Sequence, residues 1–110
     1  MMRKMIVVVL LACMLTATVA LTSAAGCTIL NTGMNNEYNG SYYISQAWAK
    51  AEATNNSYIV CVGITRNGIV SYINQTVVHS GTTLTCYSQQ AQLSPFIINS
   101  YSPYVYYYLA

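Results

Sequence analysis

Apolar and polar residues alternate along the segment between residues 41 and 54. Alanines occupy every second position from 47 to 53, and the positions between them carry larger side chains, namely Gln46, Trp48, Lys50 and Glu52. A repeat of two is typical of a strand that is buried on one side. Alanine, lysine and glutamate are also strong helix formers, so propensity alone would favour a helix. We expect a strand, because the alternation continues without a break into a turn.

Turn signals divide the chain that follows into three more segments. Asn55-Asn56, Asn67-Gly68 and Ser80-Gly81 separate stretches rich in Val, Ile, Thr and Tyr, a composition typical of strands. If each turn is a two-residue hairpin loop, residue 54 pairs with 57, 66 with 69, and 79 with 82. This register collects apolar residues mainly on the alanine side and polar residues mainly on the other side. The pattern predicts a four-stranded antiparallel meander over about residues 41–90.

An open sheet with one apolar face needs a cover. The candidates are Thr28–Leu30, Phe96–Ile98 and the tyrosine-rich stretch Tyr101–Leu109. The predicted fold class is therefore all-β, a small antiparallel β-sandwich built on the meander with a Tyr-rich C-terminal strand. Residues 26–40 are rich in Asn and Gly, so we expect them to form mainly loop.

The first 25 residues predict a helical secretory signal peptide. A basic head is followed by an apolar run from Met5 to Leu15 and by small residues up to Gly26, which is the usual order of such signals. The uninterrupted run is about 11 residues long, whereas a membrane-spanning helix needs about 20. We therefore divide the chain into a signal (1–25), an Asn/Gly-rich segment (26–40) and a β domain (41–110). The protein is expected to be secreted or to lie at the cell surface.

Three of the four cysteines follow the predicted signal: Cys27, Cys61 and Cys86. In the meander, Cys61 and Cys86 face opposite sides with one strand between them, and their Cα atoms lie about 9–10 Å apart. That exceeds the roughly 7 Å limit for a disulfide, so either Cys27 pairs with one of them or the strand order is not sequential. Cys27 also follows Ala24-Ala25-Gly26, which allows a third interpretation as the lipidated first residue of a bacterial lipoprotein.

Charged residues are scarce. The chain has four basic and two acidic residues, and removal of the signal leaves a net charge of zero from Lys50, Arg66, Glu37 and Glu52. A basic nucleic-acid interface is excluded, because it needs clustered Lys and Arg. With His79 as the only histidine and no aspartate, a catalytic triad has few ways to assemble. No metal or phosphate motif is present either, so we expect a protein that is not an enzyme and has no cofactor.

Eleven tyrosines and one tryptophan are the conspicuous feature. Tyrosine joins a large ring to a hydrogen-bonding hydroxyl, which suits protein interfaces and sugar faces, although it also simply fills strands. We expect Trp48, Tyr72, Tyr104 and Tyr106 to contact a protein partner or an envelope glycan. The predicted register places Trp48 opposite Gly63 and near Tyr72. The uncharged, Tyr- and Val-rich composition also predicts self-association.

Two other functions fit the same layout. A signal followed by a short β domain is similar to the layout of small exported β-sandwich bacteriocins, and this resemblance implies a secreted toxin that assembles on membranes. The second alternative is a cell-surface protein anchored by lipid on Cys27. Contact with a membrane is expected only under one of these two alternatives.

Overall fold

The computed structural model describes residues 23–24 and 26–110. The predicted signal peptide lies outside this part, apart from Ser23–Ala24, which form the short strand β1 and pair with the start of β2. None of the helices in the described residues has the length and hydrophobicity to cross a membrane. The described chain is all-β, as predicted.

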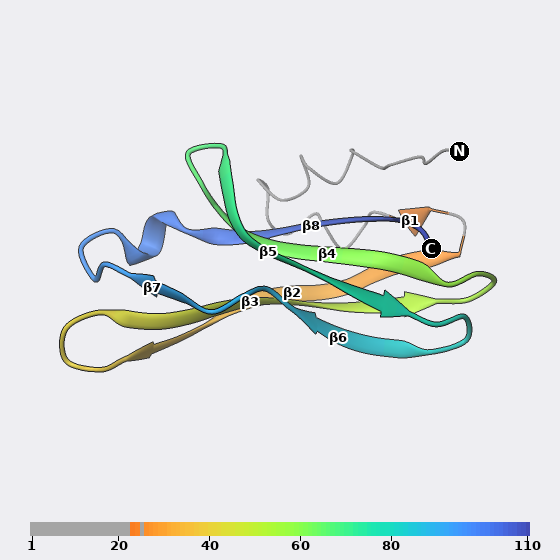
Figure 1. Ribbon diagram of the computed structural model, residues 1–110, viewed down its shortest axis with the longest axis horizontal. Coiled ribbons are helices and arrows are strands. Elements are labelled where there is room, and N and C mark those ends of the chain that lie inside the picture. The colour runs from red at the N-terminus through yellow and green to blue at the C-terminus, as the bar shows by residue number, and fades with distance from the viewer. Residues whose placement is uncertain (1–22, 25) are drawn as a thin grey trace.

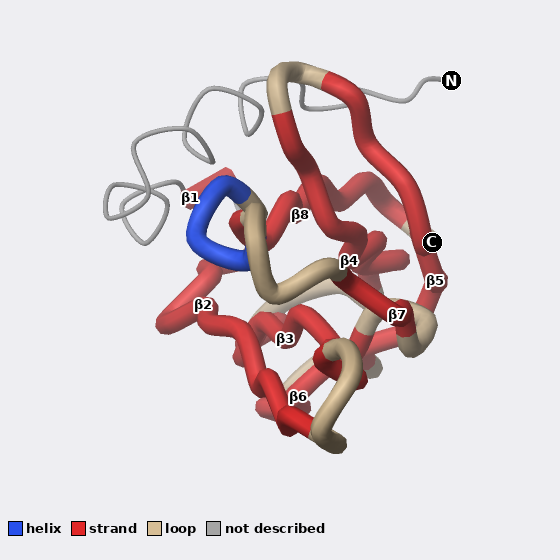
Figure 2. The backbone as a smooth tube through the Cα atoms, turned by 90° about the vertical axis from the view of Figure 1, so that its left-hand side faces the viewer, coloured by secondary structure: helices blue, strands red, loops and turns tan. Residues whose placement is uncertain are grey.

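Two antiparallel sheets pack face to face (Figures 1 and 2). The larger sheet has the order β1-β2-β3-β6, and β7 pairs with another part of β3. The smaller sheet has the order β5-β4-β8. In the described part of the chain, the other strands and the 3₁₀ turn η2 span these residues: β2 Cys27–Tyr38, β3 Tyr43–Ala53, β4 Tyr58–Arg66, β5 Ile69–Val78, β6 Thr83–Tyr87, β7 Ala91–Leu93, η2 Ile98–Ser100 and β8 Ser102–Leu109.

The segment with alternating alanines forms β3, so the strand interpretation is confirmed over the helix. Its four alanines, at positions 47, 49, 51 and 53, are at most 1 % exposed and face β4 and β8 across the core. Val60, Val62 and Val105 fill the facing side of that core. Because alanine side chains are short, the two sheets can pack closely while the larger residues of the smaller sheet occupy the space between them.

The predicted meander is wrong in two of its three pairings. β3 and β4 lie in different sheets, as do β5 and β6. Only the Asn67-Gly68 hairpin forms as expected, with Arg66 paired to Ile69. Both turn residues have positive φ, 54° and 80°, which is the type I′ geometry that Asn-Gly favours.

The other two turns carry the chain from one sheet to the other. The turn after β3 and the turn after β5 lie side by side and are joined by hydrogen bonds. Ser80 Oγ donates to the Thr54 carbonyl at 3.0 Å, and the Ser80 N–H donates to Ser57 Oγ at 3.0 Å. These bonds give the polar atoms of both crossovers partners at the same end of the sandwich.

The prediction of loop for residues 26–40 is also wrong. Residues 27–38 form β2, the longest strand, which pairs with β3 from Cys27–Ala53 to Tyr38–Tyr43. The tight turn that follows is held by Asn39, whose side-chain oxygen accepts the N–H groups of Ser41 and Tyr42 at 3.0 Å. Pairing with the strongly patterned β3 therefore outweighs the low strand propensity of an Asn-rich sequence.

A bulge in β5 reverses the predicted alternation of that strand. Val62 pairs with Asn74 and Ile64 with Ser71, so that Tyr72 and Ile73 together oppose Gly63. Tyr72 has a φ of 59°, the left-handed conformation found in many bulges. Beyond the bulge every side chain changes face. As a result Val78 is fully buried, whereas Val77, which the predicted two-residue hairpin register places on the alanine side, is 44 % exposed.

Candidate functional site

Trp48 lies on the outer face of the larger sheet, directly between Gly33 of β2 and Tyr87 of β6. The indole packs on the bare backbone of Gly33, where an added Cβ would be 2.6 Å from Trp48 Cζ2. Tyr87, on the other side, is 43 % exposed. The prediction that Trp48 lies opposite Gly63 and near Tyr72 is wrong, because those residues belong to the other sheet.

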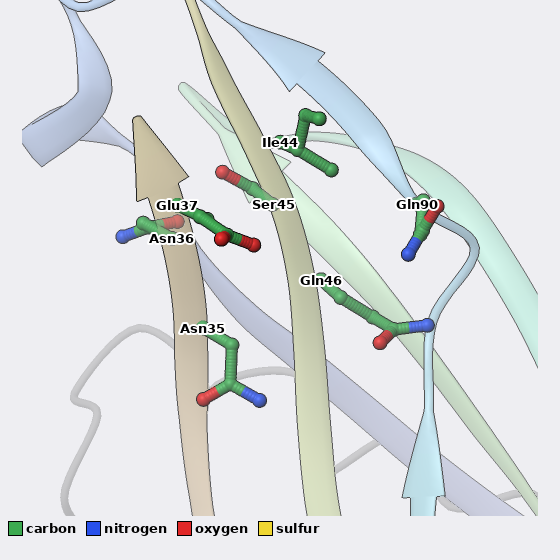
Figure 3. A pocket seen from close by; sticks show the side chains of 7 residues that line it. All are labelled: Asn35, Asn36, Glu37, Ile44, Ser45, Gln46 and Gln90. Atoms are coloured by element: carbon green, nitrogen blue, oxygen red, sulfur yellow. The ribbon is translucent and has the colours of Figure 1, made fainter. Parts of the chain in front are cut away.

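A polar hollow of about 190 Å³ lies beside this aromatic pair on the same face. Asn35 pairs with Gln46 two residues along from the Gly33–Trp48 pair, a step of about 6.7 Å along the strands. Figure 3 shows Gln46 and Gln90 extending over the same space, with Glu37 on the β2 side. The full lining is Asn35, Asn36, Glu37, Ile44, Ser45, Gln46 and Gln90.

The hollow is built on a connection that hydrogen bonds hold against β3. Gln46 Nε2 donates to the Ser88 carbonyl at 2.9 Å, and Ser88 Oγ accepts the Ala47 N–H at 2.9 Å. The Ser88 N–H in turn donates to the Ala47 carbonyl at 2.9 Å. Ser88 is 1 % exposed, so this link is shielded from water and fixes the position of Gln90 two residues later.

The two described carboxylates are far apart. Glu37 pairs with Ile44 at one end of β3, and Glu52 lies at the other end, about 27 Å away at the usual rise of a strand. A pair of acidic groups acting on one bond needs a separation below about 10 Å, so these two cannot form such a pair. His79 is exposed. Within residues 23–24 and 26–110, no group of three or more His, Cys, Asp or Glu side chains could hold a metal ion.

Tyr104 and Tyr106 lie together on the outer face of the smaller sheet, with Tyr108 next in the row. Their ring centroids are 5.7 Å apart, and the rings of Tyr106 and Tyr108 stack at 6.3 Å. Gln75 Nε2 donates to the Tyr108 hydroxyl at 3.3 Å, which ties the row to β5. The whole sandwich separates this tyrosine row from Trp48, so the predicted aromatic residues do not form one surface.

All three described cysteines are buried and unpaired, so the predicted disulfide is wrong. Cys61 faces outward from β4, as predicted, between Gln75 and Tyr106 on the neighbouring strands. Burial raises the pKa of the Cys61 thiol, and burial together with the hydrogen bond to Cys61 raises the pKa of Tyr106 to about 12. The tyrosine row therefore covers a thiol.

Cys27 and Cys86 face the interior and belong to the core. Burial is the main cause that raises the pKa of Cys27 to about 12 and that of Cys86 to about 11. Both thiols thus stay protonated and unreactive at neutral pH. Attachment of a lipid to Cys27 would require its sulphur to leave the core, since the residue is 1 % exposed.

Tyr72, the fourth predicted binding residue, lies at the β5 bulge and lines a second hollow together with Arg66 and Tyr101. This hollow lies under the β4–β5 hairpin, away from both Trp48 and the tyrosine row. The predicted set of four residues is thus divided among three places, and only Tyr104 and Tyr106 are neighbours.

Sequence reasoning missed most of the partners of Trp48. The predicted register places Tyr87 on the same side of the sheet as Trp48, but Gly33 and Asn35 lie in the segment predicted to be loop. The sequence around Gln46 and Gln90 contains no motif that marks either residue as part of a binding site. No protein-family model matches this chain, and no curated protein or solved structure is significantly similar to it.

Proposed function

We propose that this protein is a non-enzymatic binding protein that holds a neutral glycan on the outer face of its larger sheet. The observation that carries the proposal is the placement of the Trp48–Tyr87 aromatic pair beside a hollow lined by amides. Carbohydrates present apolar C–H faces and many hydroxyls. This surface offers matching groups for both.

The aromatic pair would contact the apolar face of a sugar ring. Trp48 is held flat against Gly33 and is half-buried, while Tyr87 remains 43 % exposed. A ring held in place as Trp48 is provides contact area with little loss of side-chain freedom on binding. The Trp48 ring is therefore already in position in the free protein.

The amides would recognise hydroxyl groups. An Asn or Gln side chain has donors and an acceptor, and four such residues, Asn35, Asn36, Gln46 and Gln90, line the hollow. Gln46 uses one N–H for the Ser88 carbonyl and keeps its carbonyl oxygen for a ligand. Glu37 is the only charged residue in its lining. The absence of a cation from that lining favours an uncharged ligand over a phosphate or a sulphate.

The test uses the intrinsic fluorescence of Trp48, the only tryptophan in the chain. The protein is titrated with an N-acetylglucosamine hexamer and with cellohexaose as neutral probes. Binding of an oligosaccharide is expected to change the tryptophan emission. Gln46→Ala is expected to lower the affinity by about tenfold, equivalent to about 1.4 kcal/mol. Because Trp48→Ala removes the fluorophore, its affinity is measured by isothermal titration calorimetry, and the same tenfold fall in affinity is expected.

Tyr104→Ala is the matched control, because it removes an aromatic side chain from the opposite face of the sandwich. It is expected to bind both probes as the wild type does. If neither probe binds, or if Tyr104→Ala weakens binding as much as Trp48→Ala, the proposal is rejected.

A second candidate, a toxin that assembles on membranes, is supported by exposed apolar residues at one end of the sandwich. Phe96 is 94 % exposed and Ile69 at the hairpin tip is 70 % exposed. The β7–η2 connection and the β4–β5 hairpin that carry them lie at the same end of the long axis (Figure 1). Leakage of dye-loaded liposomes that is lost in Phe96→Ser and Ile69→Ser would support this function, and the absence of leakage by the wild type would exclude it.

A further inference from the structure

A second hollow, of about 200 Å³, lies between the β4–β5 hairpin and the segment that leads into β8. Figure 1 shows the hairpin rising from the body of the sandwich next to η2 and the start of β8. Ile64, 1 % exposed, belongs to the core at the base of the hollow, while Ile69 is 70 % exposed. The remaining lining residues are Arg66, Ser71, Tyr72 and Tyr101.

Arg66 is held in place by neutral groups. Its Nε donates to Ser100 Oγ at 2.8 Å, and Ser100 Oγ donates in turn to the Ile97 carbonyl at 2.6 Å. The guanidinium carbon also lies 5.8 Å from the centre of the Tyr101 ring, a cation–π contact. These contacts fix the plane of the guanidinium and leave its terminal N–H groups for a ligand.

The charge of Arg66 is not balanced by a carboxylate of the described chain. Glu37 and Glu52 both lie on the larger sheet, and neither forms an ion pair with Arg66 among the described residues. A cation that is held in a fixed position beside a hollow, and whose partners are all neutral, is suited to bind an anion from outside.

The opposite wall is shaped by the β5 bulge. Tyr72 has a φ of 59°. This conformation is unfavourable for residues other than glycine, and it occurs preferentially at ligand sites. The bulge is held by Gln89, whose N–H donates to the Tyr72 carbonyl at 2.9 Å and whose Nε2 donates to the Ile73 carbonyl at 3.0 Å. The wall carrying Tyr72 is therefore formed in the free protein.

We infer that this hollow is a binding site for a carboxylate attached to a small apolar or aromatic group. A planar guanidinium matches a carboxylate through two parallel hydrogen bonds. Arg66 is the single charged residue in the lining, so a singly charged carboxylate is balanced there, whereas a doubly charged phosphate is not. The apolar part of the ligand would contact Ile69 and the rings of Tyr72 and Tyr101.

The size of the hollow limits what can enter. Sites for complete drug-sized ligands measure about 300–1,000 Å³, so this smaller hollow accepts only one terminal group. A free aromatic acid and the C-terminal residue of a peptide both offer that group. This site lies on the other sheet from Trp48 and does not depend on the proposed glycan binding.

The test is an NMR titration of the ¹⁵N-labelled protein with N-acetylphenylalanine and with its uncharged amide. The same comparison is made with a short peptide ending in phenylalanine, with a free or an amidated C-terminus. The free carboxylates are expected to shift the backbone signals of Ser71, Tyr72 and Tyr101, and the amides are not. A shift with the peptide but not with the small acid would identify a chain terminus as the ligand, and the reverse would identify a free acid.

Arg66→Gln is expected to weaken binding of the carboxylate by at least about tenfold, while Arg66→Lys retains part of it. Lys50→Gln is the matched control, because it removes the same charge from the other sheet and is expected to bind as the wild type does. A dispersed spectrum shows that each variant is folded. The inference is overturned if neither free carboxylate shifts these signals at millimolar concentration, if the amides bind equally well, or if Lys50→Gln weakens binding as much as Arg66→Gln.

Discussion

Substitution of Gly33 by alanine tests whether the close packing of Trp48 on β2 is real. The added Cβ would lie 2.6, 2.7 and 2.9 Å from Trp48 Cζ2, Cε2 and Nε1, so the indole must move by about 1 Å to restore ordinary contact distances. Overpacking of this kind costs about 1–3 kcal/mol. Gly33 does not have a positive φ, so alanine itself strains nothing and stabilises by about 0.4–1 kcal/mol through the unfolded chain. The net expectation is a loss of about 1 kcal/mol.

The clash can be separated from all other effects by a double-mutant cycle with Trp48→Ala. Without the indole, the new methyl group meets open space, and Gly33→Ala should stabilise by about 0.5 kcal/mol. The coupling energy between the two positions is then about 1.5 kcal/mol, well above the usual error of such cycles. Chemical denaturation followed by far-ultraviolet circular dichroism measures all four proteins.

The fluorescence of Gly33→Ala provides an independent readout. Displacement of the indole into solvent should move its emission to longer wavelength, and the affinity for the neutral oligosaccharides should fall with it. A coupling energy near zero, in which Gly33→Ala has the same effect with and without the indole, would refute the packing described here. An unchanged emission maximum would refute it as well.

Three further predictions concern the fold. Burial raises the pKa of Cys27 to about 12 and that of Cys86 to about 11, from 9.0. The unfolded chain therefore releases these two protons at lower pH than the folded chain, so their contribution to the free energy of unfolding is fully present below pH 9 and falls towards pH 11. Equal melting temperatures at pH 9 and pH 11 would contradict this. Gly68→Ala should lower the free energy of unfolding by about 1 kcal/mol or more, because φ is 80°, a conformation that alanine adopts only at a cost. No atom lies within 4 Å of the new Cβ, so no clash contributes, and an unchanged denaturation midpoint would contradict this conformational cost. Ala49→Leu should lower the free energy of unfolding by about 1–3 kcal/mol, because Ala49 is fully buried between the two sheets; a thermal melt equal to that of the wild type would disprove this.

Local patterns predicted the elements of this fold better than their arrangement. The alternation around Trp48 correctly indicated a strand with its alanines inside, and Asn67-Gly68 correctly indicated a hairpin and its register. Alternation shows only which side of a strand is buried. In a sandwich, two consecutive strands bury the same side whether they are neighbours in one sheet or face each other across the core. The turns at 55–56 and 80–81 were misassigned for this reason.

The site depends on features that single-sequence patterns do not contain. The bulge at Tyr72 adds one residue to β5 and exchanges its two faces, and nothing in the sequence around it marks that position. Gly33 looks like part of a loop until Trp48 is known to lie opposite. Trp48, Tyr104 and Tyr106 are half-buried on the outer faces of the sheets and Tyr72 is exposed, but their grouping required the pairing of strands that are distant in sequence.

The order in which β4 gains its neighbours has a consequence for folding. β5 follows it directly through a tight hairpin, whereas β8 is the last of the described strands, and Ile59 pairs with Tyr108 only after the whole chain between them is made. Pairings between such distant segments form slowly. Until β8 docks, one edge of β4 is open and Tyr106 does not yet shield Cys61. Docking of β8 therefore also protects a thiol from oxidation, and a chain delayed before that step exposes both a free strand edge and a reactive sulphur to its neighbours.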